Sequence, residues 1–154
     1  MAIRNAGILA HVADRLQIPT FLSEQYPKGL GPTDPGLAQQ LSPATKRLEK
    51  TCFSCSEADG FVDSLRQANR QQVVLAGMEA HICVLQTAMG LRTEGFDVFV
   101  VEDATCSRNI ENRRNAMDRL RQAGITLTNT ESVIFEWLRD ARHPEFKGIS
   151  ALLR

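Results

Sequence analysis

The sequence has no long apolar run, no excess of one charge and few aromatic residues. No stretch approaches the roughly 18 to 20 apolar residues that cross a bilayer, so we expect no membrane partner. Eighteen basic residues balance 18 acidic ones and aromatic residues make up 6% of the chain, which together disfavour nucleic-acid binding. Charges interrupt the apolar pattern at the amino terminus, so it does not form a secretory signal, and we expect a cytoplasmic protein.

The motifs for a structural metal or a redox pair are incomplete as well. Cys52 and Cys55 form one Cys-x-x-Cys pair, but neither a second pair nor a His-x-x-x-His accompanies it, and a structural zinc needs four ligands. The pair sits in a polar connection, whereas a thioredoxin-type motif follows a strand and opens a helix. A chain of 154 residues can bury a core without cross-links, so we predict free thiols, no metal and no cofactor.

The chain does contain a regular alternation of amphipathic helices and short apolar strands. The predicted helices cover 2–16, 58–69, 81–94, 108–123 and parts of 131–153, and the predicted strands cover 18–23, 72–77, 96–103 and 125–129. The stretch 24–57 is rich in Gly, Pro, Ser and Thr and is predicted to be a long surface connection with room for one helical turn.

Continuously apolar strands that alternate with helices predict a parallel sheet covered on both faces. We expect the strand over 72–77 to be buried on both faces, and the helix over 108–123 to turn Ile110, Met117 and Leu120 inward. The predicted fold class is α/β, with a single domain over residues 1–154. The chain opens with a helix and has four predicted strands, which is a thin sheet for this class.

Cys83 lies where the strand over 72–77 has ended and the next helix begins. Ligands of open parallel sheets gather beyond the carboxyl ends of the strands. In the first turn of a helix, unpaired backbone N–H groups and the positive end of the helix dipole favour a thiolate, which is a nucleophile. The same N–H groups can hold an oxyanion after attack on a carbonyl. Cys83 is therefore a candidate nucleophile, and the alternative is a small buried hydrophobic residue.

His81 and Asp103 are the neighbouring candidates. His81 is a possible general base, but residues two apart on one helix point in different directions, which favours a surface or packing role. Asp103 ends a predicted strand and is well placed for a site. Capping the next segment or bonding a neighbouring loop is its more frequent role.

The block "VVLAGMEAHICVLQTAMGLRTEGFDVFVVEDATCSR" resembles the core of the isochorismatase-like cysteine hydrolases, in particular their isochorismatase domain-containing branch. The stretches "SEQYPKGLGPT", "LEKTCFSC" and "RHPEFKGISALL" also resemble that branch, so the similarity covers essentially the whole chain. The resemblance implies a three-layer α/β/α fold with a mostly parallel, Rossmann-like sheet.

The resemblance also implies a site built from a cysteine, a lysine and an aspartate. The cysteine corresponds to Cys83 and the lysine to Lys50 of "EKTCFS", whose ammonium would stabilise a thiolate. A cis peptide bond is implied between Met78 and Glu79, which would turn the Glu79 N–H to join that of Cys83 in an oxyanion hole. Members of nicotinamidase type hold a metal through Asp and His, and "SEQYPKGLGPT" has no His, so the resemblance predicts no metal here.

The chain departs from the family pattern at its start. The family aspartate ends a first strand, in an Asp-x-Gln segment, and this chain has neither that strand nor that aspartate. Because the strand is central to the family sheet, we expect a gap between the second and third strand regions. We interpret the chain as an amino-terminally truncated product of a longer gene. The alternative is a true short variant whose gap is filled by rearrangement or by a partner chain.

The leading functional hypothesis is a cysteine hydrolase of a small amide or related C–N bond. Activity should be weak without the aspartate, since general acid–base help is worth roughly 10² to 10⁴-fold. Isochorismate cleavage breaks a vinyl ether and does not need the cysteine, so Cys83 disfavours that substrate. The alternative is a catalytically degenerate interaction or regulatory protein of the same fold. The family implies a small-molecule substrate and a homo-oligomer, and zero net charge disfavours a ribonuclease.

Overall fold

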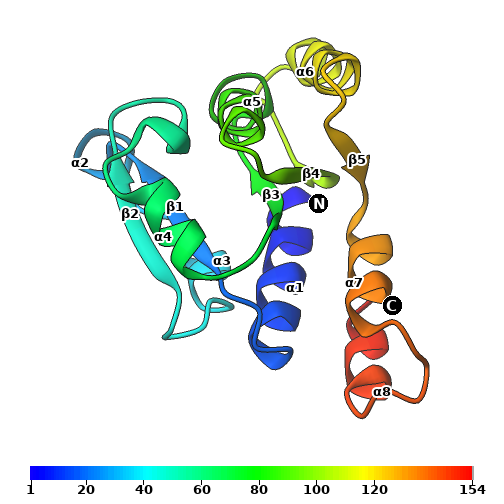
Figure 1. The fold of residues 1–154 in the computed structure, drawn as a ribbon. Coiled ribbons are helices and arrows are strands. Elements are labelled where there is room, and N and C mark those ends of the chain that lie inside the picture. The colour runs from blue at the N-terminus through cyan, green and yellow to red at the C-terminus, as the bar shows by residue number, and fades with distance from the viewer. Residues whose placement is uncertain (154) are drawn as a thin grey trace.

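The computed structural model describes residues 1–153 and shows a mixed α/β fold (Figure 1). The elements along the chain are α1 (Ala2–Arg15), β1 (Phe21–Gln25), α2 (Pro27–Leu30), α3 (Pro35–Ala38), β2 (Lys46–Lys50), α4 (Phe61–Gln67), β3 (Gln72–Gly77), α5 (Leu85–Thr93), β4 (Asp97–Thr105), α6 (Ile110–Gln122), β5 (Thr126–Thr128), α7 (Thr130–Leu138) and α8 (Phe146–Ser150). Two 3₁₀ turns, η1 (Cys55–Glu57) and η3 (Ala151–Leu153), and one π-helical turn, η2 (Ala80–Val84), complete the list.

The strands of residues 1–153 form two separate parallel sheets instead of one. β1 pairs with β2, with Gln25 opposite Lys50. β3, β4 and β5 form the second sheet in that order. A break in the sheet was predicted, but its position was wrong. The second and third predicted strand regions pair directly as β3 and β4, and the break separates β1 from β3.

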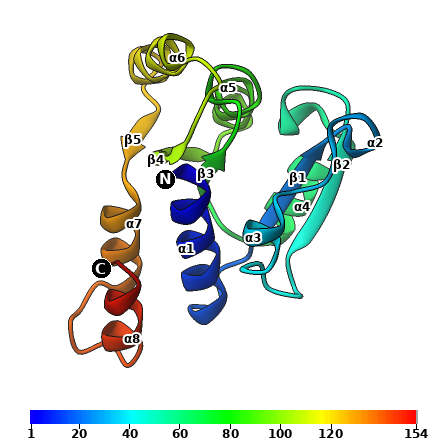
Figure 2. The same cartoon turned by 180° about the vertical axis from the view of Figure 1, so that it is seen from behind.

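Helices cover both faces of the three-stranded sheet (Figures 1 and 2). On one face, α5 and α6 bury Leu91 and Leu120 in a cluster that includes Val100 of β4. On the other face, α1 and α7 bury Val12 and Ile134 in a cluster that includes neighbouring residues of β4. The predicted three-layer α/β fold is therefore confirmed.

Caps and glycines fix the helix boundaries. The Asn109 side chain accepts the Glu111 N–H at 2.8 Å at the start of α6, and Asn129 does the same for Ser132 at the start of α7. Gly95 and Gly124 follow the ends of α5 and α6 and adopt φ values of 91° and 72°, which favour glycine. The strand predicted over 18–23 is shifted and lies over 21–25.

Three sequence predictions are wrong. The stretch 24–57 contains β2, whose sequence KRLEK has four charged residues and therefore no apolar pattern to detect. Ile110 is 57% exposed because it opens α6 in front of the buried Met117 and Leu120. β3 is not buried on both faces: its valines are half-buried and Ala76 is exposed, since β3 is an edge strand next to a cavity.

Candidate functional site

The carboxyl ends of β1, β2 and β3 meet at one place. Gln25 ends β1, Lys50 ends β2, and Cys83 lies in the turn η2 that follows β3. The Lys50 Nζ donates to Gln25 Oε1 at 2.5 Å, and the Cys83 Sγ lies 3.9 Å from the same oxygen. The ammonium and the sulfur are therefore separated by no more than the sum of those two distances. The structure brings the two predicted residues together, and Gln25 joins them.

Lys50 is buried, with 6% of its surface exposed. Besides Gln25, its ammonium donates to the carbonyl oxygens of Cys52 at 3.0 Å and Phe53 at 2.8 Å. All three acceptors are neutral, and no carboxylate of residues 1–153 forms an ion pair with this lysine. A buried charge without a counterion is costly, so these three hydrogen bonds hold an ammonium that still lacks an anionic partner.

The chain that follows Lys50 is fixed on the helix that follows Cys83. The Cys55 N–H donates to Thr87 Oγ1 of α5 at 2.9 Å. Gly90 of α5 lies so close to this segment that a Cβ at that position would be 2.9 Å from the Ser56 Cβ and closer still to its hydroxyl. A glycine is required at position 90 for this approach. The contact holds the end of β2 in place relative to the cysteine turn.

The turn η2 is held against the segment that follows β4. The Ala80 N–H donates to the Cys106 carbonyl at 2.8 Å, and the Cys106 N–H donates to the Gly77 carbonyl at 3.1 Å. Gly77 has a φ of 113°, a conformation that residues with a side chain rarely adopt. The peptide bond between Met78 and Glu79 is cis. Two backbone hydrogen bonds thus fix the start of the segment that carries the cysteine.

His81 faces away from this site. Its Nδ1 lies 3.0 Å from Ser107 Oγ and 3.5 Å from Glu79 Oε2, and its Nε2 lies 3.3 Å from Asn112 Nδ2. The Glu79 carboxylate also accepts the Arg108 N–H at 3.1 Å. Both ring nitrogens are therefore occupied by neighbours other than Cys83, which supports the packing role and not the general base.

The burial and hydrogen bonds of the remaining cysteines and of Asp103 indicate structural roles. All four cysteines are free thiols, as predicted, and Cys55 is buried. Burial, and secondly the Glu79 carboxylate, raise the pKa of the Cys106 thiol. Asp103 accepts the N–H and the hydroxyl of Thr130, each at 2.8 Å, so it caps the start of α7. This is the predicted bond to a neighbouring part of the chain, whereas the next helix, α6, is capped by Asn109 and not by Asp103.

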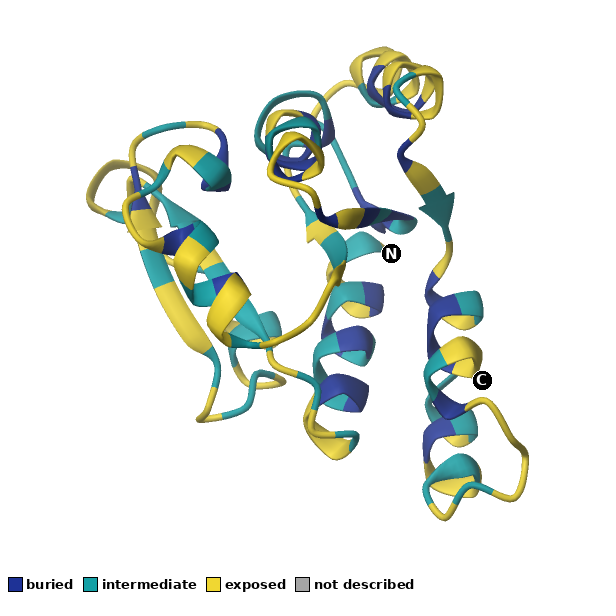
Figure 3. Ribbon diagram, in the orientation of Figure 1, coloured by how far each residue is buried: buried dark blue, intermediate teal, exposed yellow. Residues whose placement is uncertain are grey.

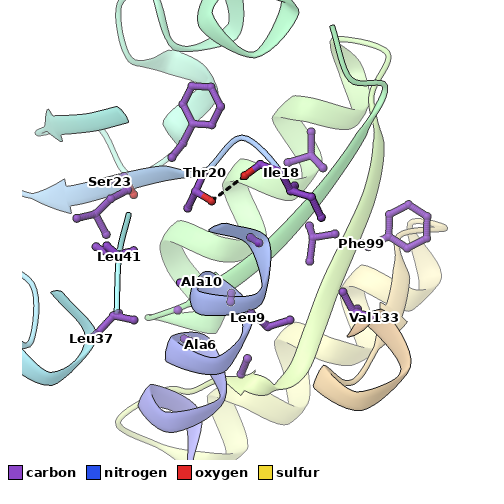
Figure 4. Close-up of a pocket in the computed structure, with 18 of the residues that line it drawn as sticks. Ala6, Leu9, Ala10, Ile18, Thr20, Ser23, Leu37, Leu41, Phe99 and Val133 are labelled. Carbon is purple, nitrogen blue, oxygen red and sulfur yellow. Dashed lines mark hydrogen bonds between the residues drawn. The ribbon is translucent and has the colours of Figure 1, made fainter. Parts of the chain in front are cut away.

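A large cavity opens beside the site. Its volume is 1660 Å³, and Lys50, Cys83 and Met78 are part of its lining. Figure 4 shows Ala6 of α1 and Ser23 of β1 among the side chains that line it. The cavity offers a small molecule access to the sulfur.

Gln25 is the site residue that sequence reasoning missed. It stands in the stretch "SEQYPKGLGPT", which contributes to the family resemblance and to the prediction of no metal. The predicted strand stopped at residue 23, so Gln25 fell into the connection. With the strand ending at 25, the rule that ligands gather at carboxyl ends of parallel strands would have identified it.

Within residues 1–153, no group of three or more His, Cys, Asp or Glu side chains is arranged to hold a metal ion. Over the same residues, no helix has both the length and the apolar character needed to span a bilayer.

Known proteins match this chain over most of its length. The family model described as the isochorismatase domain matches residues 1–132. Isochorismatase domain-containing protein 2 from Danio rerio is 44% identical over 153 residues, which are 98% of this chain and 75% of the relative.

Solved structures also match this chain over most of its length. The structure of MAR1 ribonuclease from Caenorhabditis elegans has a TM-score of 0.93 and 40% identity, and the match covers 99% of this chain and 78% of that one. The YcaC gene product of Escherichia coli, an octameric hydrolase of unknown specificity, has a TM-score of 0.90 and 31% identity over 97% of this chain and 74% of that one. Both structures thus share the fold of this chain over nearly its whole length.

Proposed function

This chain belongs to the isochorismatase family, and from that premise we propose that it is a hydrolase scaffold in which Cys83 attacks a small amide or related C–N bond. The observation that carries the proposal is the convergence of the Cys83 Sγ and the Lys50 Nζ on Gln25 Oε1 at the edge of a cavity. A nearby ammonium stabilises a thiolate, which is the attacking form of the cysteine. The E. coli relative, a hydrolase of unknown specificity, supports the reaction class.

The reaction proceeds in two steps. The Cys83 sulfur bonds to the carbonyl carbon, and the backbone N–H groups of Glu79 and Cys83 hold the oxyanion. The C–N bond then breaks, and the amine leaves with the proton that the thiol gave up. In the second step, water adds to the thioester, the carboxylic acid leaves, and the thiol is restored.

We expect this chain to turn over slowly. Within residues 1–153, the Cys83 sulfur and the Lys50 ammonium have no carboxylate among their hydrogen-bond partners. A base that takes the thiol proton and later activates water is worth roughly 10² to 10⁴-fold. Its absence equally favours the second candidate, a protein of the same fold that binds a partner without turnover.

The test is a panel of small primary amides and anilides, incubated with the protein and two cysteine variants. Wild-type protein and Cys106→Ala should release product and carry an acyl adduct at Cys83 by mass spectrometry. Cys83→Ala should do neither. Cys106 is the matched control because it lines the same cavity. Equal turnover by Cys83→Ala would show that Cys83 is not the nucleophile, and no turnover and no adduct in any protein would favour the non-catalytic candidate.

A ribonuclease is a further candidate because the C. elegans structure is that of a ribonuclease. The zero net charge of this chain disfavours attraction to a phosphate backbone. Incubation with a labelled single-stranded RNA distinguishes a ribonuclease from the proposed amide hydrolase. Cleavage that persists in Cys83→Ala would show an RNA-directed activity separate from the proposed chemistry.

We propose a homo-oligomer as the working form. The E. coli relative is octameric, and large apolar side chains are exposed around this site. Tyr26 and Phe53 are each 53% exposed, and Met78 is 61% exposed. Exposed apolar side chains of this size mark association surfaces when they adjoin one another. Light scattering over a range of concentrations should give a mass well above 17.1 kDa, and a monomer throughout would contradict this.

A further inference from the structure

Gln25 and Lys50 end the two strands of the smaller sheet on the same face. They are paired in the parallel register of β1 and β2, and just beyond them the Tyr26 N–H donates to the Lys50 carbonyl at 2.8 Å. Side chains at paired positions of neighbouring strands project from the same face of a sheet. The strand register therefore places the Gln25 amide beside the Lys50 ammonium.

The partners of the Gln25 amide fix its orientation. Its Nε2 donates to the Thr51 carbonyl at 2.7 Å, and a carbonyl can only accept. Its Oε1 accepts from the Lys50 ammonium at 2.5 Å, and an ammonium can only donate. An amide rotated by half a turn would lose both hydrogen bonds. Oε1 is therefore the amide atom that faces the Cys83 sulfur, at 3.9 Å.

All three donors of the Lys50 ammonium are used on oxygen atoms. A lysine ammonium has three N–H donors, and these bond to Gln25 Oε1 and to the carbonyls of Cys52 and Phe53. None is left for the sulfur, whose hydrogen-bond partner within residues 1–153 is Gln25 Oε1. A charge-assisted hydrogen bond from ammonium to sulfur would stabilise a thiolate most strongly. In this arrangement the Gln25 oxygen takes the donor that could form it.

The amide oxygen also favours the protonated form of the sulfur. A thiol can donate its S–H to Gln25 Oε1, whereas a thiolate in the same place would face the negative end of the amide dipole. The Lys50 ammonium has the opposite effect, because a positive charge favours the thiolate. Gln25 thus holds the ammonium near Cys83 and at the same time weakens its effect on the sulfur.

We propose that Gln25 is a positioning residue that restrains Cys83 by keeping one donor of the Lys50 ammonium away from the sulfur, so that the resting sulfur is a thiol. Loss of the amide oxygen frees this donor, and the thiolate becomes more abundant. The proposal concerns the regulation of the proposed hydrolytic site and rests on Cys83 as its nucleophile. Alkylation measures the restraint without any turnover, so failure of one proposal is distinguishable from failure of the other.

Two variants that share one loss and differ in another test this role. Gln25→Met keeps the length of the side chain and removes both the acceptor for the ammonium and the donor for the Thr51 carbonyl. Gln25→Glu also removes that donor, but it keeps an acceptor and gives it a negative charge. A merely structural role predicts that both variants change Cys83 alike, because both lose the bond to Thr51. The restraint predicts opposite changes.

The measurement is the rate at which iodoacetamide alkylates Cys83 in the full chain, followed by peptide mapping across a range of pH. At neutral pH, Gln25→Met should react about three- to tenfold faster than the wild type, and Gln25→Glu should react slower by a similar factor. The pH at which the rate reaches half of its maximum should fall in Gln25→Met and rise in Gln25→Glu. Gln25→Met/Lys50→Met should be no faster than Lys50→Met, because the acceleration comes from the freed ammonium.

Two other cysteines report on the fold in the same samples. Cys55 is buried and bonded to α5, so its labelling should stay slow unless the segment after Lys50 opens. Cys106 lines the same cavity as Cys83, so a general change in access would alter its labelling as well. If Cys55 becomes reactive in Gln25→Met, then Gln25→Leu, which lacks the same two polar atoms, takes its place with the same expected acceleration.

The proposal is overturned if Gln25→Met slows the alkylation of Cys83 or leaves it unchanged, or if the acceleration persists without Lys50. Acceleration in Gln25→Glu would overturn it too. If no protein turns over an amide but Gln25→Met is still the fastest and Gln25→Glu the slowest in alkylation, the restraint is supported and the hydrolytic proposal fails.

Discussion

Five of the nine residues of β4 are buried, whereas β1 and β2 together bury one residue, Lys50. Figure 3 shows the same contrast, with the dark blue of burial concentrated around the three-stranded sheet and its helices. Besides its pairing with β2, β1 makes an edge contact between Phe21 and Phe61, whose ring centroids are 5.9 Å apart, and its end forms hydrogen bonds at the site.

The two sheets therefore contribute different things. Apolar burial around β4 gives the three-stranded part its stability, since each fully buried large side chain is worth about 1.5 to 3 kcal/mol. The two-stranded part places Lys50 and Gln25 opposite Cys83 with polar bonds and little core. Substitutions in the first part should change the stability of the whole chain, and those in the second should change the chemistry of Cys83.

The largest difference should come from matched leucines in the two parts. Leu91→Ala removes a side chain that is 0% exposed in the three-stranded part, and it should lower the free energy of unfolding by about 2 to 5 kcal/mol. Leu48→Ala, at a half-buried position of β2, should cost roughly 1 kcal/mol. Urea unfolding followed by circular dichroism measures both. Equal losses would show that the two parts are stabilised alike.

The contact between the two parts should be nearly as sensitive. Gly90→Ala places a methyl group against Ser56 and should cost about 1 to 3 kcal/mol, because the segment after Lys50 must move away from α5. The double variant with Ser56→Gly makes room for the methyl and should recover most of the loss. No recovery in the same urea experiment would mean that the cost arises within α5 itself.

Lys50→Met should act on chemistry more than on the fold. Without the ammonium, the Cys83 thiolate loses its nearest positive charge, and alkylation of Cys83 by iodoacetamide should slow about tenfold. Lys28→Met is the control, since it removes the same charge from an exposed lysine of α2 that takes no part in these contacts. Equal slowing in both variants, or no slowing in Lys50→Met, would show that the Lys50 ammonium does not activate Cys83.

The smallest effect is expected at Cys106. Burial is the main reason that the pKa of this thiol is raised, and the Glu79 carboxylate adds to it. Glu79→Gln removes only the second cause, so the pKa should fall and alkylation of Cys106 at neutral pH should speed up a few-fold, to an extent limited by the remaining burial. Labelling of Cys52 should stay the same. Slower alkylation of Cys106 in Glu79→Gln would contradict the assignment that the Glu79 carboxylate raises the pKa of this thiol.

The same contrast explains what the sequence could predict. The residues of β3 and β4 form apolar runs in the sequence, and the helices that cover them have caps and closing glycines. These patterns predict the strands and helices with nearly correct bounds. β2 is an edge strand of charged residues, and its buried member is a lysine, so no local pattern identifies it. Ile110 shows the reverse error, because periodicity alone does not say where the first turn of a helix protrudes into solvent.

The site divides in the same way. Cys83 could be identified by its position between a strand and a helix, and Lys50 only by resemblance, because its approach to Cys83 depends on how two separate sheets are placed.

Competitive alkylation of the four cysteines in the native protein tests the central claim most directly. With limiting iodoacetamide and peptide mapping, Cys83 should be labelled first, ahead of the half-exposed Cys52 and of Cys106, with the buried Cys55 last. Labelling of Cys83 no faster than that of Cys52 or Cys106 would contradict the claim that the meeting of the two sheets activates this sulfur.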